Sequence, residues 1–301
     1  MIREDIIDLF RVPTNGKVRL KDYNPGWKQT AEFEDFGKDA VKERAQEMLA
    51  KSLCELAEAQ DLLYADNRYA ILIVLQAMDA AGKDGTIKHV MSGVNPQGCQ
   101  VFSFKKPSSE DLEHNFLWRH MKCLPERGRI GIFNRSYYED VLVVKVHPEL
   151  ISPQLPRKKE KVGKKFWEHR YEDINAFEQH LVRNGTVILK FFLNVSKDEQ
   201  KARFLERLSR PEKHWKFSAS DLSERAYWDE YMDAYEDALA ATSTKWAPWY
   251  VIPADNKWVT RAVVADIVTT AICGLDLKYP EVTAEQEKLL NEARTKLAME
   301  T

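Results

Sequence analysis

The sequence predicts an α/β protein built around a parallel sheet that helices cover on both faces. Apolar runs rich in β-branched residues, such as YAILIVLQ (69–76) and TVILKFFLNV (186–195), are typical of buried strands. Segments with helical spacing of apolar residues separate these runs, and strands alternating with helices favour parallel pairing. With 301 residues, 44% of them apolar, the chain can bury a full core.

The expected elements follow in order along the chain. Residues 1–28 are expected to form an extended surface arm, because prolines and glycines stand there among charges. Apolar spacing from about 30 to 64 predicts one long helix or two shorter ones. Ser108 and Asp111 predict a capping box at the start of a helix. The later strands are expected at 99–104, 128–133, 186–195 and 247–253, and the helices at about 83–91, 108–124, 157–183, 197–209, 221–241, 257–273 and 283–299.

Charge and cysteine usage narrow the class of protein. A net charge of −2 gives no global attraction to nucleic acid or to an anionic membrane, so a polyanion would need a local patch of cations. Cys54, Cys99, Cys123 and Cys273 are scattered, which predicts buried thiols in a reducing compartment. The N-terminal residues do not resemble a signal peptide, and no apolar run approaches the ~20 residues that span a bilayer. We expect a cytoplasmic protein that binds neither membranes nor nucleic acid.

The turn after the first strand, MDAAGKDGT, has the features of a phosphate-binding loop. Gly82 and Gly85 let backbone N–H groups approach a phosphate, and the N-terminus of the following helix contributes roughly half a positive charge. Lys83 adds a full charge. The strict pattern G-x-x-x-x-G-K-[ST] is not met, because Ala77 replaces its first glycine and Asp84 its hydroxyl residue. A tight turn with a solvated lysine is the alternative.

Asp79 lies inside this loop and predicts a metal ion. A carboxylate beside a phosphate is costly unless a cation stands between them. Magnesium, with manganese as a substitute, would be held partly by Asp79 and partly by phosphate oxygens. Such a site suits phosphoryl transfer, which needs alignment and cations rather than a Ser-His-Asp set.

Several segments together resemble a known family. They are MDAAGKDGTIKHVMSGVNPQG, FLWRHMKCLPERGRIGIF and FNRSYYEDVLV, followed by KFWEHRYEDINAFE, ILKFFLNVSKDEQKARFLER and PEKHWKFSASDLSERAYWDEYMDAYE. Through these segments the chain resembles the polyphosphate kinase 2 family over about residues 20 to 280.

The resemblance implies both a fold and an activity. The fold would be a P-loop kinase-like three-layer sandwich forming a single domain over residues 1–301, with a five-stranded parallel sheet in the order 2-3-1-4-5. An N-terminal arm and helix would span about 1–66, and a helical lid about 197–242. The activity would be magnesium-dependent phosphoryl transfer between inorganic polyphosphate and adenine or guanine nucleotides. A homodimer or homotetramer is expected.

The resemblance also implies roles for residues at matching positions. Asp79 would organise magnesium, Lys83 would contact the transferred phosphoryl group, and Arg135 would neutralise its developing charge. Many members have aspartate where this chain has Asn134. Asn134 and Glu139 together resemble the third subclass, which accepts both nucleoside mono- and diphosphates. The other phosphate- or nucleotide-binding residues implied are Ala80, Ala81, Gly82, Asp84, Gly85, Thr86, Arg119 and Asp140.

Basic residues beyond the loop predict contacts with a long polyanion. At 100° per residue, Arg203, Arg207 and Arg210 fall within about 60° of one another, on a face expected to point away from the core. A lid closing over phosphates would use such a face, and an ordinary solvated helix surface is the alternative. The residues expected on the lid or on polyphosphate are Lys105, Lys106, Arg203, Arg207, Arg210, Lys213 and Lys216, and the basic run 157–170 could add to them.

Two other functions compete with this expectation. A conventional nucleoside or nucleotide kinase would use ATP as donor and would ignore polyphosphate. A non-catalytic polyanion-binding protein, such as an RNA-binding module, would bind in a salt-dependent way and would tolerate loss of Lys83. The set of Asp79, Lys83 and Arg135 disfavours the second alternative, because binding alone does not require that arrangement.

Overall fold

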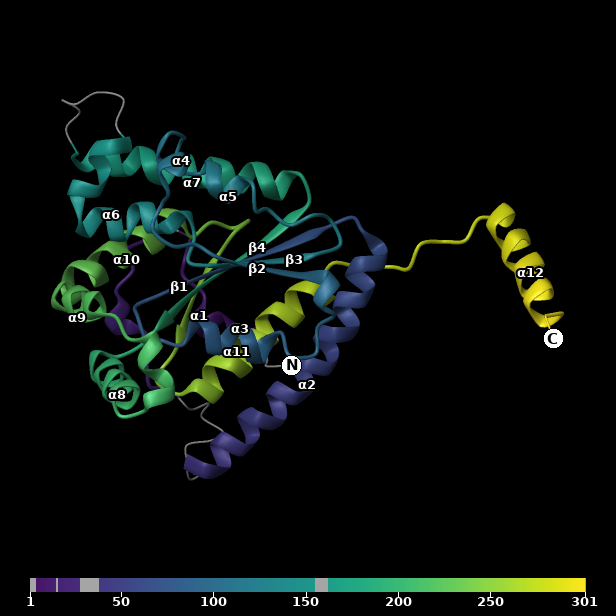
Figure 1. The fold of residues 1–301 in the computed structure, drawn as a ribbon, viewed down its shortest axis with the longest axis horizontal. Coiled ribbons are helices and arrows are strands. Elements are labelled where there is room, and N and C mark those ends of the chain that lie inside the picture. Colours follow the sequence, from purple (N-terminus) through teal and green to yellow (C-terminus); the bar gives the residue numbers. More distant parts are fainter. Residues whose placement is uncertain (1–3, 15, 28–37, 155–161, 301) are drawn as a thin grey trace.

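The sheet has the predicted order and direction. The computed structural model describes residues 4–14, 16–27, 38–154 and 162–300. Within those residues, five parallel strands pair in the order β2-β3-β1-β4-β5, and helices lie on both faces of the sheet (Figure 1). The strands are β1 (Ala70–Ala77), β2 (Cys99–Ser103), β3 (Ile130–Asn134), β4 (Thr186–Asn194) and β5 (Trp249–Pro253).

Two groups of helices cover the sheet. On one face, α11 (Lys257–Cys273) packs along α2 (Lys38–Asp66) and against α3 (Lys83–Val90). On the other face, α10 (Trp228–Thr242) packs against α7 (Lys164–Arg183). The remaining α-helices in the described residues are α1 (Glu4–Phe10), α4 (Ser109–Leu112), α5 (Trp118–Met121), α6 (Val143–Val146), α8 (Lys197–Leu208), α9 (Ala219–Ala226) and α12 (Ala284–Ala298). The start of the predicted helix at 157 and the first residues of the predicted helix at 30 lie outside the described residues.

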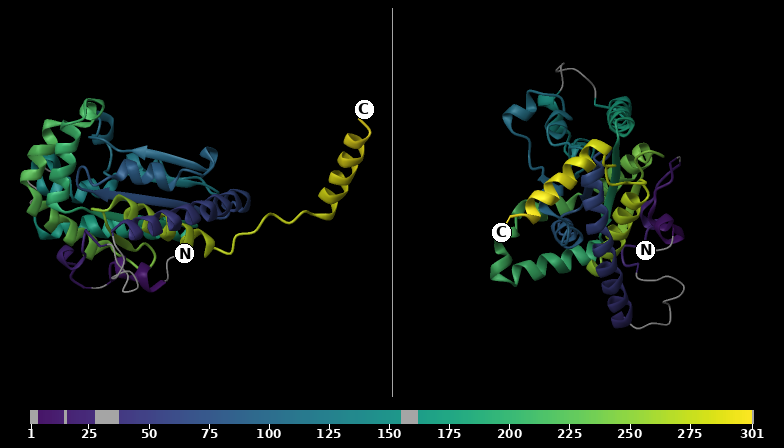
Figure 2. Two further views of the ribbon diagram at one scale, coloured as in Figure 1. Left: turned by 90° about the horizontal axis from the view of Figure 1, so that it is seen from below. Right: turned by 90° about the vertical axis from the view of Figure 1, so that its right-hand side faces the viewer.

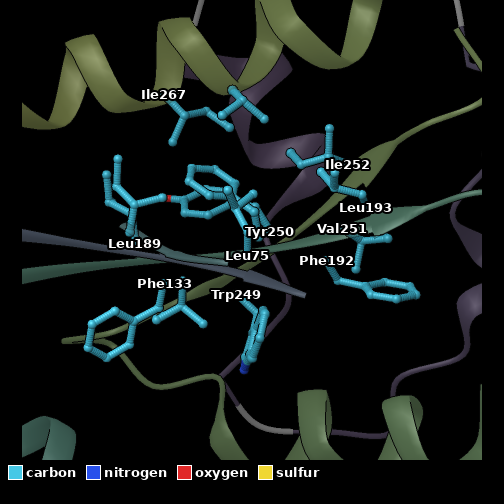
Figure 3. Close-up of a cluster of buried hydrophobic side chains, with 14 of the residues drawn as sticks. Leu75, Phe133, Leu189, Phe192, Leu193, Trp249, Tyr250, Val251, Ile252 and Ile267 are labelled. Atoms are coloured by element: carbon cyan, nitrogen blue, oxygen red, sulfur yellow. The ribbon is translucent and has the colours of Figure 1, made fainter. Parts of the chain in front are cut away.

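The apolar core fills the space between the sheet and both helical layers. Figure 3 shows Ile267 of α11 on one side of the strands and Trp249 and Phe133 on the other. Tyr231 and Tyr235 of α10 are buried in this core. Within the predicted lid at 197–242, α10 is therefore part of the core, which leaves α8 and α9 to border the site.

The N-terminal segment is not the extended surface arm that the sequence suggested. It forms α1, and Phe10 and Val12 are buried in the core. The backbone N–H of Val12 donates to the carbonyl of Trp249 at 2.9 Å, and Arg11 pairs with Tyr250 as an antiparallel bridge. The arm thus covers the exposed edge of β5, a contact that a pattern of charges and prolines along one segment does not reveal.

Two predicted helices are each interrupted. Ser108 and Asp111 form the expected capping box, but the helix ends at Leu112 and a second short one begins at Trp118. Between them, the side chain of Asn115 accepts a hydrogen bond from the backbone of Leu117, which starts a new turn. The helix predicted at 221–241 is likewise divided at Tyr227 into α9 and α10.

The cysteines also differ from expectation. Cys54 and Cys273 are exposed, and Cys99 and Cys123 are half-buried, so the prediction of four buried thiols is wrong. Cys54 lies within α2 and Cys273 ends α11, whereas Cys99 begins β2 and Cys123 follows α5. Residue identity alone does not predict which of these positions are exposed. Separately, none of the helices in the described ranges is long and apolar enough to cross a membrane.

His120 occupies an aromatic pocket beneath β3. Its ring lies 4.3 Å from the Phe104 ring and contacts Tyr137, and its Nδ1 donates to the carbonyl of Phe116 at 3.3 Å. Nε2 is buried and has no hydrogen-bond partner among the described residues. A second proton would therefore place an uncompensated charge in the core. Burial, followed by the charge of Arg119, lowers the pKa of His120 to about 3.

Acid should weaken the fold through His120. Its folded-state pKa is below its unfolded value, so the unfolded chain takes up the proton first as the pH falls. Stability is lost between about pH 6.5 and about pH 3, by about 1.4 kcal/mol per pH unit. Urea titrations at several pH values should show the unfolding free energy of the wild type falling relative to that of His120→Leu by this amount as the pH is lowered. His169→Leu, the same change at an exposed histidine, is the control. Wild-type and His120→Leu lines that stay parallel would contradict the assignment.

Candidate active site

The loop between β1 and α3 has a backbone shaped by two left-handed residues. Ala80 has φ 61° and Gly82 has φ 112°, and α3 begins at the next residue, Lys83. The glycine is required there because side-chain-bearing residues rarely adopt this region. The loop consequently turns the first N–H groups of α3 toward the carboxyl end of the sheet, where a phosphate can be bound.

Lys83 folds back over the loop. Its Nζ donates to the carbonyl of Ala77 at 2.8 Å, and only 9% of the residue is exposed. Burial, followed by the charge of Arg135, lowers the pKa of Lys83, while Asp79 and Glu139 act in the opposite direction. A bound phosphate would favour the charged amine. This buried position disfavours the alternative of a solvated lysine on an ordinary turn.

Asp79, Arg135 and Glu139 form a connected set above the loop. Arg135 has φ 63°, and its Nη2 donates to Asp79 Oδ1 at 2.9 Å. Its Nη1 lies 3.9 Å from Glu139 Oε2, and Gln76 Nε2 donates to Glu139 Oε1 at 3.1 Å. Glu139 is the leading cause that raises the pKa of Arg135. Within the described part of the chain, the Asp79 bond is the only hydrogen bond that the Arg135 side chain makes, so most of its guanidinium donors can meet a ligand.

Asn134, the last residue of β3, holds the carboxylate of Asp84, which lies in the first turn of α3. Its Nδ2 donates to Asp84 Oδ1 at 2.9 Å and approaches Ser103 Oγ at 3.3 Å. An aspartate at position 134 would place two carboxylates at hydrogen-bond distance. The amide therefore keeps a second negative charge away from Asp84 beside the loop.

These elements enclose a cleft of about 750 Å³. Its wall contains the whole loop from Asp79 to Thr86 together with six other residues predicted from the sequence: Lys105, Lys106, Asn134, Arg135, Arg207 and Lys213, and Arg203 also reaches it. The structure thus brings together residues at or just after the ends of β1, β2 and β3 with residues of α8 and of the turn that follows it. They are up to 134 positions apart in sequence, counted from Asp79 to Lys213. Convergence at the carboxyl ends of parallel strands explains the arrangement.

Arg203 differs from its predicted setting. It is 5% exposed, so the expectation that it shares an outward face with Arg207 and Arg210 is wrong. Its five N–H groups reach five oxygens: the carbonyls of Ala80 and Ala81, those of Ala254 and Asp255, and the carboxylate of Glu199. Because an arginine has five donors, none is left for a phosphate. The packing of α8 against the loop turned this side chain inward.

The other predicted basic residues divide between the cleft and the outer surface. Arg207 Nη1 lies 3.8 Å from Asp221 Oδ2, and Lys213 Nζ donates to Glu206 at 2.9 Å, both in the cleft wall. Arg210 is half-exposed and does not line the cleft, although its Nη2 lies 3.4 Å from Glu206 Oε1, the oxygen that Lys213 contacts. The side chain of Lys216 and the basic residues at 157–161 lie outside the described residues.

Arg119 and Asp140 lie apart from the cleft. Arg119 Nη1 donates to the carbonyl of Lys105 at 2.7 Å, and its guanidinium lies over the Phe104 ring. Asp140 is 4% exposed and lies 4.0 Å from Arg170 Nη1. Arg119 therefore supports the segment that carries the two lysines after β2, rather than lining the wall itself.

Several cleft residues were not anticipated from the sequence. Lys257, Thr260 and Arg261 come from the first turns of α11, and Asp221 comes from α9. Arg261 Nη2 would lie 3.8 Å from a Cβ at Gly85, so it borders the phosphate loop directly. The positions of these residues in the sequence could have predicted their role. The helix α11 follows β5 as α3 follows β1, and two basic residues stand four positions apart at the start of α11.

The donor set fits a magnesium ion that is shared with substrate. No cluster of three or more His, Cys, Asp or Glu side chains within the described ranges could hold a metal alone. Asp79 and Asp221 both line the cleft. Burial, followed by the charge of Asp79, raises the pKa of Asp221. Magnesium is commonly held by one or two carboxylates plus substrate phosphates, and this pair offers that arrangement.

Comparisons with known proteins agree with this geometry. The family model described as polyphosphate kinase 2 matches residues 39–278. The chain is 55% identical to an ADP-polyphosphate phosphotransferase of Rhodopseudomonas palustris, covering 93% of this chain and 99% of the relative. It is 45% identical to an AMP/ADP-polyphosphate phosphotransferase of Meiothermus ruber, covering 94% and 99%. The crystal structure of polyphosphate kinase 2 from Arthrobacter aurescens superimposes with a TM-score of 0.82 at 40% identity, covering 95% and 96%. The chain belongs to the polyphosphate kinase 2 family.

Proposed function

We propose that this chain transfers phosphoryl groups reversibly from inorganic polyphosphate to AMP and ADP, giving ADP and ATP. The observation that carries the proposal is the convergence of Asp79, Lys83 and Arg135 on one cleft at the N-terminus of α3. Two similar proteins are named for the same donor, one with ADP as acceptor and one with AMP or ADP. A phosphate-binding cleft in a member of this family supports the same chemistry here.

The residues would act by alignment and charge. An oxygen of the acceptor's terminal phosphate attacks the terminal phosphorus of polyphosphate, and the bond to the rest of the chain breaks, which shortens it by one phosphate. Lys83 and the loop N–H groups would hold the transferred group, and Arg135 would meet its developing charge through its remaining donors. Arg203 would brace the loop by binding two of its carbonyls. No general base is needed, because the acceptor oxygen is already ionised.

Magnesium would complete this site. We assign Asp79 as its protein ligand and Asp221 as a second carboxylate within reach. When bound, the ion would neutralise phosphate oxygens between the two substrates. Asp79 would also keep Arg135 in position through the 2.9 Å bond.

Asn134 and Glu139 support acceptance of both AMP and ADP. Asn134 donates to Asp84, and Glu139 is held by Gln76, so both side chains lie in fixed positions beside Arg135. Because the side chain at position 134 is neutral, it would not repel the additional negatively charged phosphate that ADP carries relative to AMP. The relative from Meiothermus ruber carries both acceptors in its name.

Polyphosphate would extend from the loop along Lys257 and Arg261. Both cations border the cleft, and burial followed by the charge of Arg203 lowers the pKa of Lys257, a cost that an anion would relieve. Lys257→Ala and Arg261→Ala should each raise KM for long-chain polyphosphate roughly tenfold, about 1.4 kcal/mol, while KM for ADP and kcat stay close to wild type. Steady-state kinetics at fixed ionic strength would measure this, with Arg210→Ala as the surface control. A rise in the nucleotide KM instead would assign α11 to the nucleotide.

The first experiment is formation of ATP and ADP from long-chain polyphosphate and magnesium, with AMP or ADP as acceptor, beside Lys83→Ala. ATP from both acceptors, lost in the variant, is expected. Activity with ADP alone would overturn the role of Asn134 and Glu139. No turnover with polyphosphate, while ATP serves as donor to another acceptor, would identify a conventional kinase. Salt-dependent RNA binding that survives Lys83→Ala, without turnover, would identify a binding protein.

A further inference from the structure

The C-terminal helix stands away from the rest of the molecule. After α11 the chain runs out as an extended segment and forms α12 (Ala284–Ala298) at a distance from the sheet, as two views show (Figures 1 and 2). Every residue of α12 is exposed. The helix lies beyond residue 278, where the match to the family model ends.

The sequence of α12 has the features of a helix that packs against another element. Thr283 and Gln286 form a capping box at its start. Yet an isolated helix of 15 residues is only marginally stable in water, and packing of an apolar face supplies most of the stability of helices in proteins. Within the described part of the chain, no element provides that packing for α12.

An apolar stripe runs along one side of α12. At 100° per residue, Leu289, Ala293, Leu297 and Leu290 fall within about 100° of one another. The leucines at 289, 290 and 297 are 59%, 59% and 66% exposed. Such a stripe in solvent is typical of a helix that docks on a partner.

The charged residues on both sides of the stripe indicate which kind of partner α12 binds. Glu285 and Glu287 stand near the start of α12, and Arg294 and Lys296 near its end. Glu285 and Lys296 flank one edge of the stripe, and Glu287 and Arg294 flank the other, at about 100° per residue. Each pair is centred on the point between positions 290 and 291, so the pattern is symmetric about the middle of the helix.

We propose that α12 pairs antiparallel with α12 of a second copy of this chain. A two-fold axis near position 290 brings Glu285 opposite Lys296 of the second copy, and Glu287 opposite its Arg294, on both sides of a leucine seam. Leu290 then packs near Ala293 of the second copy, and the small alanine admits the larger side chain. A parallel pair would instead align like charges. Self-complementarity of this kind is what an isologous two-fold interface requires.

This pairing links whole chains without touching the catalytic cleft. The helix is about 22 Å long, so the contact is small and depends on protein concentration. The proposal is independent of the proposed function, since it rests on residues outside the cleft.

Charge exchange in the full-length chain tests the proposal. One variant carries Glu285→Lys with Glu287→Lys, the other carries Arg294→Glu with Lys296→Glu. In sedimentation velocity over a range of concentrations, the wild type should form an assembly of twice the mass that either variant forms alone. An equimolar mixture of the two variants should restore the larger assembly. Lys288→Glu, a charge reversal on the side opposite the stripe, should behave as wild type.

Three outcomes would overturn the proposal. Either variant alone could sediment as the wild type does at every concentration. The mixture could fail to restore the larger assembly, which would indicate a disrupted helix rather than matched charges. Finally, Leu290→Asp could leave the association of the chain unchanged, or the wild type could show no association at all. Phosphoryl transfer per chain should be unchanged in all of these variants, which separates the role of α12 from that of the cleft.

Discussion

Replacing Arg135 with alanine is expected to lower kcat by about 10³-fold or more, while KM for each substrate changes less than tenfold. Removal of an arginine that meets a transferring phosphoryl group has effects of that size. Arg135 is suited to this role because its side chain is 42% exposed toward the cleft and most of its donors are available. Its backbone, at φ 63°, suits alanine no worse than arginine, so the variant should fold.

Two further variants isolate the cause of this loss. Arg135→Lys keeps the charge but loses the planar fork, so an intermediate kcat is expected. Asp79→Asn removes the partner that positions Arg135. The double variant Asp79→Asn with Arg135→Ala should show a smaller fold-loss of kcat than the product of the two single losses, because the two residues act together. Arg210→Ala, at a half-exposed arginine outside the cleft, is the matched control. A kcat within tenfold of wild type for Arg135→Ala would disprove the assigned role.

Replacing Lys190 with methionine is expected to lower the free energy of unfolding by about 3–5 kcal/mol, the usual cost of breaking a buried ion pair from one side. Lys190 Nζ lies 2.6 Å from Glu178 Oε2, and both side chains are 0% exposed. The amine also donates to Tyr138 and to the carbonyl of Thr242, while Tyr137 and Tyr138 donate to Glu178. The variant leaves the Glu178 carboxylate buried without its cation.

The matched control is Lys164→Met, the same change at an exposed pair with Glu168, where the cost should stay below about 1 kcal/mol. Urea unfolding measures both. Adding Glu178→Gln to Lys190→Met should recover part of the loss, because the uncompensated charge is then gone. A cost below 1 kcal/mol for Lys190→Met would show that the network contributes no net stability. Because Tyr137 and Tyr138 follow Arg135 closely in sequence, this network also anchors the segment that carries the site.

Local patterns in the sequence predicted the strands, the phosphate loop and most of the cleft. Strand runs such as 69–76 are buried on both faces, so their composition alone distinguishes them. The loop residues from Asp79 to Thr86 are contiguous, and their chemistry can be recognised without knowing their surroundings. Interruptions within helices were harder to predict from the sequence, because the break before Trp118 depends on the side chain of one asparagine, Asn115.

The sequence by itself determined the family and the α/β class, and it predicted most of the residues that line the cleft, because each is encoded in short segments. Only the tertiary structure decided which cations reach the cleft. Arg203 was turned inward by the carbonyls of the loop and of the segment after β5, whereas Arg261 was brought beside Gly85 from 176 positions away, the difference between 261 and 85. The physical reason is that an arginine's role depends on which acceptors surround it, and packing between distant elements places those acceptors.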